Sequence, residues 1–195
     1  VMQASAILAD KHPANMLLLR GFAEKPDWPT FPELYDLKSA AIAMYPMYRG
    51  VARLVGMDAL PFSASLDEEL EKLEAHWDAY DFFFVHVKKT DSSGEDGNFA
   101  EKVAHIEEAD AMVPRILDLE PDVMVVTGDH STPAKIRYHS WHPVPFIMSG
   151  KWCRPDGVMG FSESQCQQGA LGQFPATAAM LYALGLAERI DKFGA

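Results

Sequence analysis

Two short apolar runs most constrain how this chain can fold. Residues Phe82–Val87 read FFFVHV and residues Val123–Thr127 read VMVVT. Nearly continuous apolar runs of this length are typical of strands covered on both faces, as in parallel sheets. We therefore expect two central strands, joined by a helix over Phe99 to about Leu119 that is interrupted or bent near Pro114. The alternation of strand and helix predicts an α/β layered fold.

The other patterns extend this alternation. The Lys38–Met44 pattern fits a strand or a buried helix, and its flanks favour the strand. Ser65 is placed to cap a helix that begins at Leu66, with Glu68 completing a capping box. Strands are also expected at Asn15–Arg20 and Val144–Met148, helices at Tyr48–Val55 and Ala176–Ile190, and loops at Gly21–Thr30 and Lys88–Asn98.

A turn-like link at Pro61–Ser65 predicts a boundary between two units, residues 1–60 and residues 61–195. The chain begins at Val1 and not at a methionine. This start is typical of a cut inside a longer protein, although processing would also explain it.

Composition and charge restrict the class of protein. A hydrophobic content of 48% with 23% charged residues is ordinary for a soluble globular protein. No apolar run approaches the roughly 20 residues needed to span a bilayer. The formal net charge of −11 argues against a nucleic-acid surface. A small anionic substrate remains compatible with that charge, because a bound divalent cation inverts the local field. Only Cys153 and Cys166 are present, so a reducing compartment is expected.

Polar clusters follow the two best predicted strands. The first is DSSGEDG at Asp91–Gly97, the second is GDHSTP at Gly128–Pro133, and a third, HSWHP, spans His139–Pro143. In open α/β sheets, sites form beyond the carboxyl ends of the strands. Carboxylates and imidazoles together are good ligands for Zn²⁺, Mn²⁺ or iron, so these clusters predict a metal site.

Structural roles compete with this interpretation. Asp91 and Asp129 also suit turns and helix caps. His86 lies inside an apolar run and is expected to be a hydrogen-bonded core histidine. His105 is expected to be structural or to lie at the surface. On spacing alone, the metal site and the purely structural roles both remain open.

The same clusters resemble a known family. HVKKTDSSGEDGN, KVAHIEEAD, VVTGDHSTP and HSWHPVP, together with NMLLLRG, AIAMYPMYRGVARLVGM and the terminal KFGA, are similar to the archaeal-type, 2,3-bisphosphoglycerate-independent phosphoglycerate mutases of the alkaline phosphatase superfamily. The resemblance covers nearly the whole chain. It implies the carboxy-terminal part of a phosphatase-like three-layer α/β sandwich at residues 61–195. Residues 1–60 would be part of a smaller inserted α/β domain that binds the substrate.

The resemblance also implies two divalent metal ions, Mn²⁺ or Zn²⁺ with Mg²⁺ as a further option. Asp129 and His130 match the pair that binds the metal nearest the nucleophile. Asp91 matches a ligand of the other metal, and His139 matches the histidine ligand after the GDH motif. Glu95 stands where many members have a histidine ligand. A carboxylate still binds a hard ion there, although it changes the metal preference.

For the substrate, a small phosphorylated acid, Arg20 matches an arginine that contacts its phosphate or carboxylate. Arg49 lies where the insert presents a basic group. The family's nucleophilic serine has no match, since Ser63, Ser92 and Ser131 lie in other contexts. The chain alone is therefore expected to lack the nucleophile and to be inactive.

Three functions remain open at this stage. The first is interconversion of 3-phosphoglycerate and 2-phosphoglycerate in the cytoplasm, as an isomerase of glycolysis and gluconeogenesis. The second is hydrolysis of phosphate or phosphonate esters by a member of the same superfamily. The third is a non-catalytic metal-binding remnant.

His142 stands where many members have aspartate, and it is a candidate for a spare ligand or for a group that orients the ligands.

Overall fold

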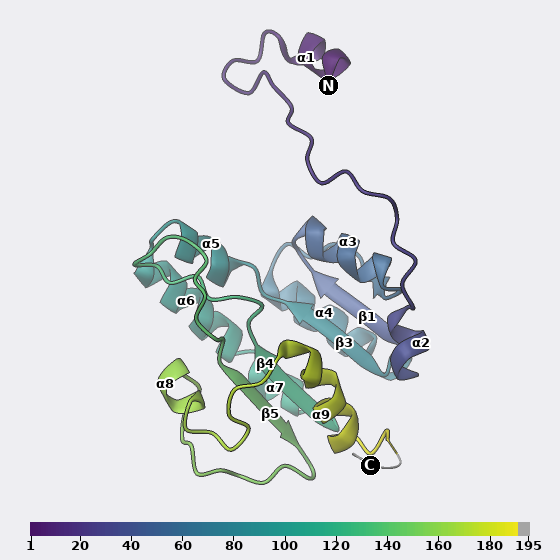
Figure 1. Ribbon diagram of the computed structural model, residues 1–195, viewed down its shortest axis with the longest axis vertical. Coiled ribbons are helices and arrows are strands. Elements are labelled where there is room, and N and C mark those ends of the chain that lie inside the picture. The colour runs from purple at the N-terminus through teal and green to yellow at the C-terminus, as the bar shows by residue number, and fades with distance from the viewer. Residues whose placement is uncertain (191–195) are drawn as a thin grey trace.

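The computed structural model describes residues 1–190, so the terminal KFGA motif lies outside the described part. A short helix, α1 (Met2–Leu8), lies away from the body of the molecule, and an extended arm leads from it back to α2 (Phe31–Tyr35) (Figure 1). Within residues 1–190, no helix is both long enough and apolar enough to cross a membrane.

The strand predicted at Asn15–Arg20 is wrong. These residues lie in the arm without regular structure, and Met16 and Leu18 are about three-quarters exposed, at 70% and 77%. A strand needs a neighbouring strand to bond its backbone groups, and no described segment pairs with this one. The apolar pattern of these residues was therefore not sufficient to predict a strand. The loop predicted at Gly21–Thr30 is confirmed.

A three-stranded parallel sheet has the order β2-β1-β3. Its members are β1 (Ser39–Ala43), β2 (Asp58–Ala59) and β3 (Phe82–His86). The central strand β1 is buried along its whole length, whereas edge strand β3 is only half-buried. The strands predicted at Lys38–Met44 and Phe82–Val87 are confirmed. Full burial of the second is not observed, because every residue of β3 is only half-buried, and within residues 1–190 it is an edge strand.

Helices pack on this sheet. α3 (Pro46–Leu54) confirms the helix predicted at Tyr48–Val55, and α4 (Leu66–Ala75) buries a leucine stripe against β1. β1 precedes the boundary predicted at residues 60 and 61, and β3 follows it, so one sheet contains strands from both sides. The division into two units stays a prediction.

Ser65 caps α4 as predicted, because its Oγ accepts the Glu68 N–H at 3.2 Å. The second half of the expected capping box differs. The Glu68 carboxylate accepts the N–H of Ala64, one residue before the cap, at 2.8 Å.

The loop predicted at Lys88–Asn98 is wrong, since α5 (Lys89–Glu95) occupies most of it. Packing against α6 (Phe99–Asp110) overrides the weak helix propensity of its serines and glycine. The predicted long helix is interrupted as expected, between α6 and α7 (Val113–Leu117). The break precedes Pro114, because a proline ring clashes with the carbonyl four residues earlier.

A second, antiparallel sheet joins β4 (Val123–Thr127) and β5 (Phe146–Gly150) (Figure 1). Both strands were predicted, and β5 begins two residues later than expected, after Pro145, which has no N–H to donate. β4 is not central, since it pairs only with β5 in the described chain.

The predicted terminal helix is shorter than expected. The remaining short elements are η1 (Trp77–Ala79), α8 (Glu163–Cys166), η2 (Ala176–Ala178) and α9 (Ala179–Leu186). The α/β class is confirmed.

Glu69 of α4 is fully buried beneath β1. Within residues 1–190, neither carboxylate oxygen has a hydrogen bond of normal geometry. Burial raises the pKa of Glu69 from its ordinary 4.5 to about 7, although the nearby Met44 backbone and Lys72 ammonium favour the charged form. Folding at neutral pH therefore carries the cost of a poorly solvated carboxylate.

This burial predicts a pH-dependent stability. At pH below 4.5 the Glu69 carboxyl is protonated in both the folded and the unfolded protein. Between pH 4.5 and about 7 the unfolded protein loses this proton while the folded protein keeps it. The free energy of unfolding therefore falls as pH rises through this range. Glu69→Gln should raise the free energy of unfolding at pH 8 by about 2 kcal/mol and flatten this slope. Urea unfolding from pH 4 to 8 measures both effects, with the exposed Glu71→Gln as control. Parallel pH profiles for Glu69→Gln and the unaltered protein would contradict the assignment.

Candidate metal centre

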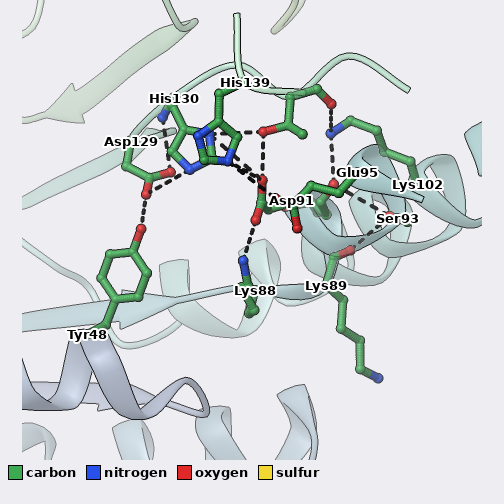
Figure 2. A network of polar contacts seen from close by, with 12 residues as sticks. Tyr48, Lys88, Lys89, Asp91, Ser93, Glu95, Lys102, Asp129, His130 and His139 are labelled. Atoms are coloured by element: carbon green, nitrogen blue, oxygen red, sulfur yellow. Dashed lines mark hydrogen bonds and ion pairs between the residues drawn. The ribbon is translucent and has the colours of Figure 1, made fainter. Parts of the chain in front are cut away.

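The sequence-predicted metal ligands come from three segments (Figure 2). Asp91 and Glu95 lie four residues apart on α5, so they share one helix face. Asp129 and His130 follow β4 directly. His139 comes from the next loop, which is tied back by a bond from Ser140 N–H to Ser131 O at 2.8 Å. The structure thus brings the predicted ligands of separate segments into one cluster.

Asp91 is the most enclosed of these ligands, with a side chain only 14% exposed. The Lys88 ammonium pairs with one carboxylate oxygen, and Thr132 Oγ1 donates to the other at 2.6 Å. Burial acts to raise the pKa of Asp91, but the bonds from Lys88 and Thr132 outweigh it and hold that pKa below its ordinary value. Asp91 is therefore a fixed anion at neutral pH.

His139 faces both carboxylates of α5. Its Nε2 lies 3.7 Å from Asp91 Oδ1 and 3.6 Å from Glu95 Oε1. Its ring stacks on His130, with centroids 3.7 Å apart. One donor atom each from Asp91, His130 and His139 lies within 4.8 Å of the other two. A cation with bonds of about 2.1 Å holds its ligand atoms roughly 3–4 Å apart, so this donor set fits a divalent metal with little movement.

A second pair of donors adjoins the first set. His130 Nε2 lies 3.5 Å from Asp129 Oδ2, which also accepts a hydrogen bond from the Tyr48 phenol. Thr132 Oγ1 gives its proton to Asp91, so it must accept at 2.9 Å from His130 Nδ1. We infer that His130 carries its proton on Nδ1 and presents the Nε2 lone pair. Thr132 thereby connects the two sets of donors.

Sequence reasoning missed Tyr48, Lys88 and Thr132. Thr132 lies in the GDHSTP motif, so that motif was the available signal. Nothing in the helical pattern around Tyr48 distinguished it, because its contact with Asp129 spans 81 residues. Such a partner becomes visible only once β1 and β3 place α3 beside the cluster.

The other histidines have different surroundings. His86, at the end of β3, stacks on Tyr48 with centroids 3.9 Å apart. Its buried Nδ1 has no hydrogen-bond partner within residues 1–190, so the expectation of a hydrogen-bonded core histidine is wrong for that atom. Burial, and next the charge of Lys88, lower the pKa of His86. His105 pairs with Glu101 and Glu108 on α6, as a structural residue would.

The expected substrate arginines lie apart from the donors. Arg20 is in the exposed arm. Arg49 Nη1 donates to the carbonyls of Ala43 at 3.3 Å and Leu60 at 2.6 Å. His142 contacts Ser140 Oγ at 3.0 Å and stacks on Trp141, outside the compact donor group. The roles expected for these three residues stay predictions.

Comparison with known proteins shows which family and which relatives this chain resembles. The family model of the metalloenzyme superfamily matches residues 5–186. A probable 2,3-bisphosphoglycerate-independent phosphoglycerate mutase of Thermotoga sp. (strain RQ2) is 49% identical over the whole of this chain and 49% of its own length. The chain therefore spans about half the length of the curated relatives it matches.

Two solved structures share the fold. A protein of Pyrococcus horikoshii is 33% identical with a TM-score of 0.80, over 86% of this chain and 54% of its own. A cofactor-independent phosphoglycerate mutase from Thermoplasma acidophilum has 23% identity and a TM-score of 0.63, over 83% of this chain and 39% of its own. Since the family model spans all but the ends of the described chain, and carboxylate and imidazole donors converge within it, this chain belongs to the metalloenzyme superfamily.

Proposed function

We propose that the protein carrying this chain interconverts 3-phosphoglycerate and 2-phosphoglycerate without 2,3-bisphosphoglycerate, as a cytoplasmic enzyme of glycolysis and gluconeogenesis. The observation that carries the proposal is the gathering at one place of Asp91, His130 and His139, whose donor atoms lie within 4.8 Å of one another. The superfamily membership and the names of relatives matched over the full chain support it. A divalent ion at such a point suits phosphoryl transfer because it neutralises charge on the attacking and leaving oxygens.

Two ions fit the arrangement of donors. Asp91, Glu95 and His139 would hold one, and Asp129 with His130 would hold the other. Two carboxylates and one imidazole are a hard donor set that suits Mn²⁺, with Zn²⁺ and Mg²⁺ as alternatives. Lys88 keeps Asp91 charged, and Thr132 orients Asp91 and His130 together.

The substrate would be a small phosphorylated acid. Arg20 and Arg49 are proposed to bind its anionic groups, since a planar guanidinium bonds carboxylate and phosphate oxygens in pairs. Arg49 uses one nitrogen for backbone carbonyls, which would fix its orientation.

The surroundings of two serines support the expectation that the nucleophile lies outside this chain. Ser63 is buried and accepts from Lys72 Nζ, and Ser131 Oγ donates to the His142 carbonyl.

A mutase assay tests the proposal directly. The intact gene product is supplied with 3-phosphoglycerate and Mn²⁺, without 2,3-bisphosphoglycerate, beside Asp129→Asn. Losing a ligand should reduce turnover by at least ~100-fold, because even groups behind the ligands contribute 10- to 100-fold. Asp118→Asn, an exposed carboxylate before β4, is the matched control.

Each alternative outcome has a meaning. Hydrolysis of p-nitrophenyl phosphate without mutase turnover would replace the proposal with an ester hydrolase. Absence of both activities, together with no retained divalent metal, would leave a non-catalytic protein of the same fold.

Metal binding supplies a test that does not depend on turnover. Titration of metal-free protein with Mn²⁺, followed by calorimetry, should give an affinity that falls at least ~10-fold in His139→Ala. His105→Ala is the matched control, because among the described residues His105 pairs with carboxylates of α6 alone. Equal losses in the two variants would show that the effect is not specific to the proposed ligand.

A further inference from the structure

Lys102 connects the two segments that carry the donors. It belongs to α6, and its side chain reaches the junction between α5 and the loop after β4 (Figure 2). Lys102 Nζ donates to the carbonyl of Thr90 at 2.8 Å and to the carbonyl of Thr132 at 3.1 Å. Thr90 immediately precedes Asp91, and Thr132 lies two residues after His130.

We propose that Lys102 is a positioning residue of the metal centre, which holds α5 and the loop after β4 in register so that Asp91 and His130 keep their places in the two adjoining donor sets. The inference rests on the proposed metal site and adds a residue to it. Lys102 would act through the main chain and not as a ligand, since its ammonium has only donors.

The close approach of the two segments supports this role. Gly94 of α5 lies against the loop, where an added Cβ would be 2.3 Å from Thr132 O and 3.1 Å from Lys102 Nζ. Only glycine fits this contact without a backbone shift. The chain therefore has a small residue where the segments meet and a cation that bonds one carbonyl from each.

An ammonium group suits this junction. It is compact and offers three donors, so it can satisfy two converging carbonyls at once. Bonds from a charged donor are about twice as strong as neutral ones. Burial lowers the pKa of Lys102, while the charges of Asp91 and Glu163 act to raise it. The neighbouring carboxylates thus offset part of the cost of burying the charge.

The position of Thr132 explains why both donors would respond. Its hydroxyl donates to Asp91 and accepts from His130, while its carbonyl accepts from Lys102. A shift of the Thr132 main chain would therefore disturb a carboxylate and an imidazole together. Lys88 bonds Asp91 and lies over the ring of Tyr45, and neither contact reaches the loop after β4, so Lys88 cannot replace this connection.

The test compares Lys102→Met with the unaltered gene product. Lys102→Met keeps the unbranched apolar stem of the side chain and removes the ammonium with its donors. Lys89→Met is the matched control, because Lys89 is on α5 and its ammonium points away from the cluster (Figure 2). Three quantities are measured: Mn²⁺ affinity by calorimetry, the visible absorption spectrum of the Co²⁺-loaded protein, and the Mn²⁺ concentration that half-activates mutase turnover.

We expect Lys102→Met to weaken Mn²⁺ binding ~10-fold, to raise the half-activating Mn²⁺ concentration to match, and to change the Co²⁺ spectrum. Lys89→Met should leave all three unchanged. Circular dichroism of the metal-free proteins checks folding. If Lys102→Met is unfolded, the same comparison is made with Lys102→Gln, which keeps a shorter amide donor and should also bind Mn²⁺ more weakly.

The outcomes separate this inference from the proposed function. A folded Lys102 variant with unchanged affinity and spectrum would overturn the positioning role while leaving the metal site intact. An unaltered protein that binds neither Mn²⁺ nor Co²⁺ would overturn the metal site and, with it, this inference.

Discussion

The hydrogen bond from Thr132 Oγ1 to Asp91 Oδ1 is the contact on which the donor arrangement depends. It joins α5 to the loop after β4, two segments 41 residues apart in the chain. The same hydroxyl accepts from His130 and so fixes the ring nitrogen that is free to bind a cation. Because Thr132 is almost fully buried, little water competes for this bond. The orientation of His130 follows from this hydroxyl, and together with Lys88 the bond to Asp91 holds that carboxylate in its charged form.

Backbone patterns in the sequence predicted much of this framework. The apolar runs that became β3 and β4 were identified because branched and aromatic residues bounded by polar segments leave few alternatives. The alanine-rich run at Lys38–Met44 also fitted a buried helix, and only its flanks favoured the strand that became β1. The run at Asn15–Arg20 has a similar pattern, but no segment of residues 1–190 pairs with it, and a strand cannot form without a partner. α5 was missed for the opposite reason, since its sequence is typical of a loop and only packing against α6 makes it helical.

The chemistry was more predictable than the connections that support it. The strand ends and the GDH motif indicated Asp91, Asp129 and His130, and the structure brings them together with His139 from the following loop. Glu95 reaches the cluster through a helical spacing and not through the predicted loop. Lys102 could not have been found from sequence, because a lysine on an ordinary amphipathic helix gives no sign that it bonds carbonyls of two other segments.

The central claim is that divalent cations bind between α5 and the loops that follow β4. Anomalous diffraction at the manganese absorption edge, from crystals of the intact gene product grown with Mn²⁺, tests it most directly. The account predicts one anomalous peak within bonding distance of Asp91, Glu95 and His139 and a second beside Asp129 and His130. A map without peaks at these side chains, or with manganese bound only elsewhere, would contradict it.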